Sequence, residues 1–197
     1  MRHFLQSVAT ISALSIIACT PILLSAKPAS AVDSTLLAQV NEKNAEAYNM
    51  RGVGRMLSGD MKRAIADYNQ ALKINPNYAE VYSNRGGARM LSGDIKGAIG
   101  DYNQALKINP NYALAYSFRG FARMKSGDKQ GAIADYNQAL KINPNYAEAY
   151  DNRGSVRFNL GDKQGAIADL QKAADLYQQQ GKTQDYQKVI EMLAMIK

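Results

Sequence analysis

The sequence predicts an all-α protein in which four helical hairpins stack into a solenoid. An Arg-Gly pair recurs every 34 residues, beginning at Arg51, Arg85, Arg119 and Arg153. The segment Asp67–Ala79 recurs twice unchanged at the same interval, and Gly-Asp divides each repeat into two helical segments. Because one hairpin cannot bury its apolar face alone, neighbouring hairpins have to stack. The composition agrees, since 46% of the 197 residues are hydrophobic and 21% are charged, which is enough to build a core.

Residues 1–31 have the order of a secretory signal peptide. A basic start precedes the uncharged run Phe4–Ala26, and the small residues Ala29 and Ala31 favour cleavage after Ala31. The mature chain is then exported to the periplasm or the extracellular space. Lipid anchoring at Cys19 and an uncleaved membrane anchor are the alternatives. Cys19 lies in the middle of the apolar run, whereas a lipidation cysteine usually ends it.

Composition excludes several kinds of chemistry. The only histidine and the only cysteine, His3 and Cys19, both precede the cleavage point, so the mature chain is expected to lack disulfides, Cys/His zinc sites and His-dependent catalysis. Removal of Arg2 and Lys27 lowers the net charge from +7 to +5, with no basic run typical of nucleic-acid binding. No later stretch is long and apolar enough to span a membrane, and no cofactor motif is present.

The 34-residue interval between the Arg-Gly pairs divides the rest of the chain into segments. We expect a short leader at 32–44 that adds a helical turn, followed by four repeats and a final helix that covers the open end of the stack. The repeats span 45–78, 79–112, 113–146 and 147–180, and the final helix lies in 181–197. In that helix Tyr186, Val189, Ile190 and Leu193 share one face, with Asp185 and Glu191 pointing outward.

Each repeat carries helix boundary signals. Glycine in the Gly-Asp pair ends the first helix in the left-handed conformation, and the aspartate caps the second helix. The pairs begin at Gly59, Gly93, Gly127 and Gly161. Asn-Pro-Asn, as at 75–77, ends the second helix, and its last asparagine is predicted to cap the next one. Asn77 with Glu80, and Asn145 with Glu148, have capping-box spacing.

These residues resemble the tetratricopeptide repeat family. Counted from Ala45, repeat positions 4, 8, 20, 24, 27 and 32 are Tyr48, Gly52, Ala64, Tyr68, Ala71 and Pro76, and the next two repeats have the same residues there. The fourth repeat departs at Leu170 and Gln178. The Asn-Arg-Gly style resembles bacterial repeats. The resemblance implies a right-handed α-solenoid of four tetratricopeptide hairpins with a C-terminal capping helix.

In this family the first helices line a concave groove that receives a peptide, mainly through repeat positions 2, 5, 9, 12 and 13, which we term the groove positions. By this resemblance the candidate peptide-binding residues are Asn49, Val53, Met56, Ser83, Met90, Ser117, Phe121, Met124, Asp151 and Phe158. The row Met56, Met90, Met124 and Phe158 suits apolar anchors. Equally, this row could pack helix against helix. The basic residues by which one branch of the family binds chaperone C-termini are absent.

Three positions depart from the family pattern in every repeat. Positions 7 and 11 are both arginine, whereas position 23 is aspartate. We expect position 7 to form buried bidentate Arg-Asp pairs between the two helices of a repeat. The predicted pairs are Arg51–Asp67, Arg85–Asp101, Arg119–Asp135 and Arg153–Asp169. For the position-11 arginines, packing along tyrosines and presentation to an anionic ligand both remain open. These arginines are Arg55, Arg89, Arg123 and Arg157.

Near-identical repeats present one surface many times and build no single asymmetric active site. We therefore expect a non-enzymatic protein-protein interaction module, an exported scaffold or assembly factor whose partner is a protein or peptide. The alternative is a self-associating structural element of the cell envelope. Catalysis by paired carboxylates is not expected, because the aspartates repeat in step with the fold.

Overall fold

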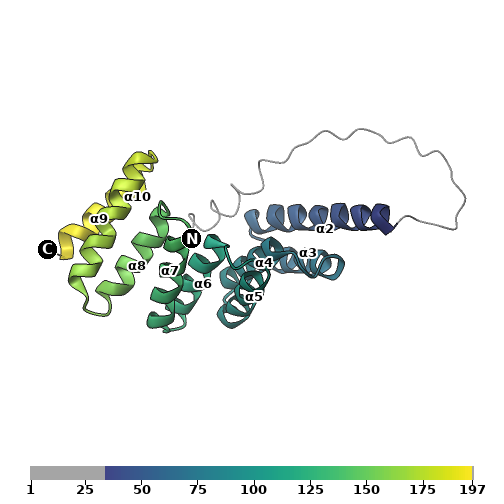
Figure 1. The fold of residues 1–197 in the computed structure, drawn as a ribbon, viewed down its shortest axis with the longest axis horizontal. Helices are drawn as coiled ribbons and strands as arrows, with labels where there is room; N and C mark the ends of the chain where they lie inside the picture. Colours follow the sequence, from purple (N-terminus) through teal and green to yellow (C-terminus); the bar gives the residue numbers. More distant parts are fainter. Residues whose placement is uncertain (1–33, 197) are drawn as a thin grey trace, which may run out of the picture. The chain divides into compact units, whose positions relative to one another are not determined.

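The computed structural model describes the backbone of residues 34–196 and the side chains of 41–196. The predicted signal segment 1–31 and Cys19 lie outside the described residues. Every regular element of the described part is a helix (Figure 1). The helices are α2 (Ser34–Leu57), α3 (Met61–Ile74), α4 (Ala79–Leu91), α5 (Ile95–Ile108), α6 (Ala113–Lys125), α7 (Lys129–Ile142), α8 (Ala147–Phe158), α9 (Lys163–Gln179) and α10 (Thr183–Ile196). The predicted all-α helical-repeat class is confirmed.

The chain forms two compact units. The N-terminal unit, up to Ser92, contains α2, α3 and α4, and the C-terminal unit, from Gly93, contains α5 to α10. In the N-terminal unit α3 packs against both α2 and α4. In the C-terminal unit each helix from α5 to α10 packs against the next one along the chain. Both units are thus built from helices that are neighbours in sequence.

The turns inside the repeats have the predicted chemistry. The four glycines of the Gly-Asp pairs have φ between 85° and 90°, in the left-handed region that favours glycine. The aspartate that follows each glycine accepts a hydrogen bond from the backbone N–H three residues later, as Asp128 does from Gly131 at 2.8 Å. An aspartate side chain therefore caps the N-terminus of the second helix in each of the four repeats.

The turns between repeats differ from the prediction. The first helices α4, α6 and α8 begin after Tyr78, Tyr112 and Tyr146, and none of these tyrosines makes a side-chain cap. The Asn75 side chain instead accepts a hydrogen bond from the backbone N–H of Asn77 at 3.1 Å. The predicted capping role of the last asparagine is therefore wrong, because the first asparagine closes the turn and helix α4 starts at Ala79, two residues after Asn77.

The core repeats the same small-to-large contact. An added Cβ at Gly52 would lie 2.6 Å from the Tyr68 ring, and one at Gly120 would lie 3.0 Å from the Tyr136 ring. Tyr68, Tyr102 and Tyr136 have no exposed surface. Glycine at repeat position 8 thus lets the tyrosine at position 24 pack directly on the first helix of its own repeat.

The two ends of the described chain depart from the sequence expectation. Helix α2 starts at Ser34, so the leader is helical over more than the single expected turn and is continuous with the first repeat. In α10, Val189, Leu193 and Ile196 enter the core of α8 and α9, whereas Ile190 is exposed. The predicted outward position of Asp185 is wrong, because its side chain is 13% exposed and is paired with Lys188.

Candidate functional site

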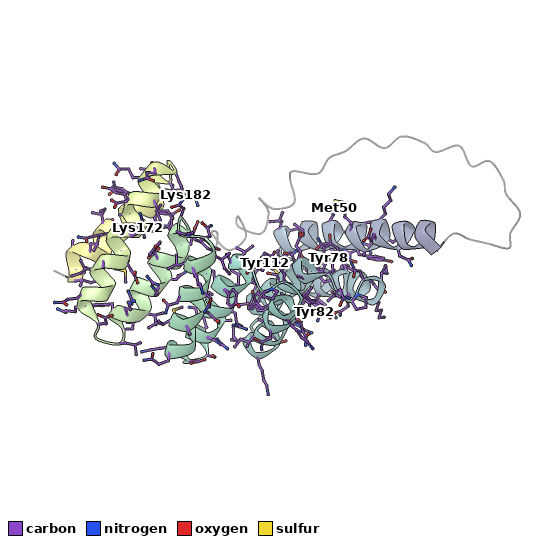
Figure 2. The ribbon with its side chains drawn as sticks, viewed as in Figure 1. Met50, Tyr78, Tyr82, Tyr112, Lys172 and Lys182 are labelled. Carbon is purple, nitrogen blue, oxygen red and sulfur yellow. The ribbon has the colours of Figure 1, made fainter. Side chains whose placement is uncertain are left out.

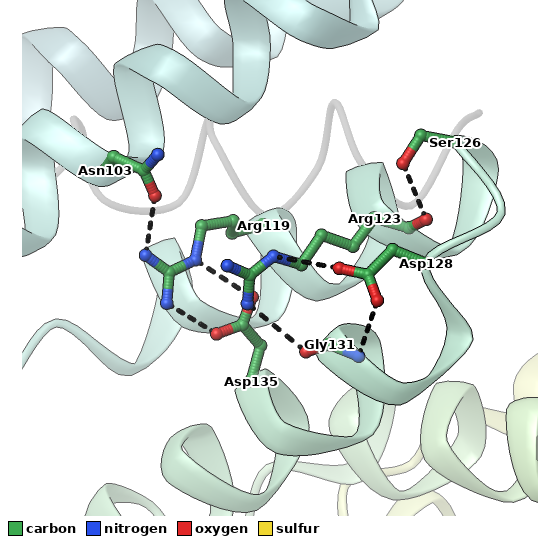
Figure 3. Close-up of polar contacts among 7 residues, drawn as sticks. All are labelled: Asn103, Arg119, Arg123, Ser126, Asp128, Gly131 and Asp135. Atoms are coloured by element: carbon green, nitrogen blue, oxygen red, sulfur yellow. Dashed lines mark hydrogen bonds and ion pairs between the residues drawn. The ribbon is translucent and has the colours of Figure 1, made fainter.

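Two arginines of one helix converge on a buried aspartate in the repeat formed by α6 and α7 (Figure 3). Arg119 donates from Nε and Nη2 to the two carboxylate oxygens of Asp135, at 2.9 and 2.6 Å. Arg123, one turn later on α6, donates from Nη1 to the same carboxylate at 2.8 Å. Arg123 also donates to the backbone carbonyl of Gly131, near the start of α7. This cluster joins the two helices of the repeat at their midpoint and at their turn.

The same arrangement occurs in the first and fourth repeats. Arg51 makes a bidentate contact with Asp67 at 3.0 and 2.7 Å, and Arg55 lies 2.7 Å from the same carboxylate. In the fourth repeat Arg153 and Arg157 bind Asp169 through the corresponding atoms. The fourth predicted pair, Arg85–Asp101, would join the two units and stays a prediction.

Neighbouring repeats are connected through the same arginines. Arg119 donates from Nη1 to Asn103, and Arg153 donates to Asn137, at 2.7 and 2.6 Å. Arg51 has no preceding repeat, and its side chain is 54% exposed compared with 15% for Arg119. Each guanidinium at position 7 also stacks over the tyrosine at position 4, at 4.8 to 5.4 Å from the ring centre. The sequence reasoning missed the asparagine, although it repeats with the aspartate in Asp-Tyr-Asn.

These contacts help to decide whether the arginines at position 11 pack within the repeat or are presented to an anionic ligand. Arg55, Arg123 and Arg157 each bind the buried aspartate of their own repeat. Arg123 and Arg157 also lie 3.6 Å from the capping aspartate at the start of the second helix. Their charge is thus compensated inside the repeat, which argues against presentation to an anionic ligand.

In the N-terminal unit the side chains at repeat positions 5, 9 and 12 are closed to solvent, whereas Leu57 at position 13 is 48% exposed. Asn49, Val53, Met56, Ser83 and Met90 are all buried, and Met56 has no exposed surface. Asn49 is held between α2 and α4, where it accepts a hydrogen bond from Asn84 and donates one to Glu80. The expectation that Met56 anchors a peptide is therefore corrected, because its side chain is a packing residue of this unit.

The groove positions of the C-terminal unit are more open. Ser117 is buried and hydrogen-bonds to Tyr146. Phe121, Met124, Asp151 and Phe158 are all partly exposed. The Lys125 ammonium lies over the Phe121 ring, 5.4 Å from its centre. Met124 and Phe158 pack against the helix cores but remain partly exposed. This unit therefore presents both apolar and polar groove side chains to solvent.

Asp151 has an unusual environment at the end of this row. Burial raises the pKa of its carboxyl to about 6, and the nearby carboxylate of Asp185 adds to the shift. Tyr177, on α9, hydrogen-bonds to Asp151, and burial together with the Asp151 charge raises the pKa of this phenol. The sequence reasoning missed Tyr177, and it placed Asp185 on the outer face without predicting its position beside Asp151. Asp185 was detectable, because it lies one full repeat after Asp151 and therefore has the same repeat position.

Residues 34–196 contain neither a candidate metal-binding cluster nor a candidate membrane-spanning helix. No cluster of three or more His, Cys, Asp or Glu side chains suited to a metal ion occurs among the described residues. None of the described helices combines the length and apolarity needed to cross a bilayer.

Comparisons with known proteins identify the repeat. The family model described as "TPR repeat" matches residues 55–93, 87–127 and 122–161, and the model described as "Tetratricopeptide repeat" matches residues 147–180. A search of curated proteins found no match.

Several solved structures are similar to the chain. The crystal structure of MamA is 24% identical with a TM-score of 0.66, over 75% of this chain and 86% of that one. The first TPR domain of Spaghetti (RPAP3), bound to the HSP90 peptide SRMEEVD, is 27% identical with a TM-score of 0.60, over 61% and 95%. The Arabidopsis OM64 TPR domain is 26% identical with a TM-score of 0.59, over 60% and 98%. Because the family models cover more than half of the sequence, the chain belongs to the tetratricopeptide repeat family.

Proposed function

We propose that this chain is a protein-interaction module that binds a peptide or an extended segment of a partner protein across the first helices of its C-terminal unit. One observation carries the proposal. The repeats share the same glycine, tyrosine, arginine and aspartate framework, yet at repeat positions 9 and 12 only the C-terminal unit has partly exposed apolar side chains, which are Phe121, Met124 and Phe158. The peptide-bound structure of the first TPR domain of Spaghetti supports this use of the fold.

We infer a non-enzymatic role, and the contacts of the repeated aspartates support this inference. The aspartates that repeat with the fold, such as Asp135 and Asp169, each accept hydrogen bonds from two arginines. A carboxylate whose oxygens are both engaged by arginines within its own repeat is not free to contact a substrate. The function is therefore recognition, and its specificity depends on the groove side chains that differ between repeats.

The proposal is tested by affinity capture from an extract of the native host. The bait is the wild-type chain, beside a Phe121→Ser, Met124→Ser double variant. Met195→Ser is the matched control, since Met195 is 77% exposed on α10 and is not a groove position. Circular dichroism first checks that all three proteins fold. A partner retained by wild type and Met195→Ser but lost by the double variant supports the groove, whereas retention by all three contradicts it.

Export is part of the proposal and rests on the sequence of residues 1–31. The chain is then an exported scaffold or assembly factor whose partners lie outside the cytoplasm. The mass of the protein purified from its host tests this directly. A polypeptide that begins at Val32 supports signal cleavage, an intact Met1 contradicts it, and a lipid-modified Cys19 would show anchoring instead.

Self-association is a second candidate function, favoured by one face of α2. Ala47, Met50 and Gly54, at repeat positions 3, 6 and 10, are exposed, and Met50 projects into solvent (Figure 2). The same positions are buried in α6, at Ala115, Phe118 and Ala122, where α5 packs against the helix. Light scattering over a range of concentrations tests the idea. A concentration-dependent dimer that Met50→Lys abolishes supports it, and a monomer at all concentrations counts against it.

A further inference from the structure

Position 5 of the first helices differs between repeats in charge. Asn49, Ser83 and Ser117 occupy it in the first three repeats, and Asp151 occupies it in the fourth. Helix α10 continues the register, so Asp185 has the same position beyond the fourth repeat. The C-terminal unit thus carries two successive carboxylates where the other repeats have short neutral side chains.

The acidic groups around this point differ in how they are compensated. Glu148 is 2.6 Å from Lys182, which lies beside the start of α10 (Figure 2). Asp185 is 3.5 Å from Lys188. Among the described residues Asp151 hydrogen-bonds to the Tyr177 hydroxyl, and the cation that acts on it is Lys188, which also pairs with Asp185. Asp151 therefore has no cation that it does not share.

The surroundings of Asp151 disfavour its charge. Burial and Asp185 raise its pKa to about 6, and Glu148 on its own helix acts in the same direction. Tyr177 of α9 and Lys188 of α10 act in the opposite direction. At pH 7 most of the carboxyl is nevertheless ionised, so a cation placed beside both aspartates would relieve the cost of desolvation and the mutual repulsion.

An apolar site lies two helical turns further along the same two helices. Phe158 of α8 and Met192 of α10 both have repeat position 12 and are partly exposed. The Ser155 hydroxyl, 3.6 Å from the Met192 sulfur, connects the helices between the two sites. Seven residues of α-helix span about 10 Å, which corresponds to roughly three residues of an extended chain.

We propose that this face of α8 and α10 binds an extended segment in which a lysine or arginine and a large apolar residue are separated by roughly three residues. The cation lies between Asp151 and Asp185, and the apolar side chain contacts Phe158 and Met192. The inference rests on the proposed function and specifies the chemistry of its partner. It also excludes an acidic segment at this point, because a like charge would be repelled.

The test uses a phage-displayed library of random linear decapeptides, selected at pH 7.5 on the full chain and on two variants. Asp151→Asn removes the charge and keeps an acceptor for Tyr177. Asp175→Asn is the matched control, because it removes an exposed carboxylate from α9. We expect wild type and Asp175→Asn to enrich peptides with a basic residue two to four positions from Leu, Met or Phe.

The most enriched peptide is then synthesised for binding measurements. We expect Asp151→Asn to weaken its binding about tenfold at pH 7.5. For wild type we expect a similar loss between pH 7.5 and pH 5, where Asp151 is protonated, and a fall of the Asp151 pKa when the peptide binds. Carbon-13 NMR of the carboxyl group measures that pKa.

The outcomes separate the inference from the function on which it rests. Peptides that bind with no basic preference, or with an acidic one, overturn the inference and leave a groove that binds peptides. Equal binding by wild type and Asp151→Asn also overturns it. A selection that enriches nothing on any of the three proteins contradicts both the inference and the proposed function.

Discussion

The N-terminal and C-terminal units are built from nearly the same repeat, yet they present different surfaces. In the N-terminal unit the side chains at repeat positions 9 and 12, including Met56 and Met90, are buried. In the C-terminal unit the corresponding Met124 and Phe158 are partly exposed. The arginine-aspartate cluster shows the reverse difference, since Arg51 is more exposed than Arg119 or Arg153.

The difference shows that a repeat motif determines the contacts within a hairpin. It does not determine which of the side chains are exposed to solvent. Arg119 is covered because Asn103 of the preceding repeat contacts it, whereas Arg51 makes no such contact with the part of the chain that the structure describes. Exposure at a given repeat position is therefore a property of the neighbours in the stack. Recognition surfaces have to be assigned position by position.

The largest expected effect compares the buried carboxylates of the two units. Asp135→Ala leaves Arg119 and Arg123 without their common partner and should lower the free energy of unfolding by about 3 kcal/mol. Asp67→Ala should cost less, because water already solvates half of Arg51. Urea unfolding followed by circular dichroism measures both. Equal losses would break the comparison, and no loss in either variant would contradict a structural role for the cluster.

Two glycines of α2 provide the next comparison. Gly52→Ala places a Cβ 2.6 Å from the Tyr68 ring and should destabilise the chain by about 2 kcal/mol. Gly54→Ala meets nothing within 4 Å and should stabilise it by up to about 1 kcal/mol through helix propensity. Shifts of opposite sign in the melting temperature are expected. The same sign for both would mean that Tyr68 does not pack on α2 as described.

The pH dependence of stability separates Asp151 from the other acidic groups. Its folded-state pKa of about 6 lies above the usual value of 3.8, so the folded chain holds this proton more tightly than the unfolded chain. The stabilising effect of protonation is present below about pH 4 and is lost as the pH rises through 6. Asp151→Asn should therefore raise the melting temperature by about 2–4 °C at pH 7.5 and leave it unchanged near pH 4. Thermal scans at both pH values measure the difference, and an equal effect at both would contradict the assignment.

The smallest effects concern two tyrosine hydroxyls of the C-terminal unit. The Tyr136 hydroxyl is buried with no hydrogen-bond partner in the described part of the chain, so Tyr136→Phe should change stability by less than about 0.5 kcal/mol. Tyr146→Phe removes a hydrogen bond with the buried Ser117 and should cost about 1 kcal/mol. Chemical unfolding of both variants provides the measurement. A larger loss for Tyr136→Phe would reveal a partner that the structure lacks.

Most of the fold could be predicted from the sequence, because its determinants are local and repeated. The positive-φ glycines, the capping aspartates and the glycine-tyrosine packing all follow from residue types at fixed spacing. The capping role predicted for Asn77 is wrong, since two asparagines flank each of these prolines and the residue types do not show which asparagine closes the turn.

The candidate site was less predictable. Met56 and Met124 have the same repeat position, so the sequence pattern predicts the same role for both. Met56 is buried and Met124 is partly exposed because the neighbouring helices pack differently around them. The raised pKa of Asp151 depends on residues of α9 and α10. The repeat pattern of the sequence does not show how close these helices lie to α8. The function proposed for the C-terminal unit therefore needed the structure.

The central claim is that the accessible groove lies in the C-terminal unit, and methionine oxidation tests it most directly. The chain is treated with dilute hydrogen peroxide, and the rate at each methionine is read by mass spectrometry, since oxidation follows exposure. Met50 and Met195 are the exposed references, and Met50 lies on the same helix as Met56. We predict that Met56 reacts at least tenfold more slowly than Met50, with Met124 in between. Equal rates at Met56 and Met124 would contradict the account.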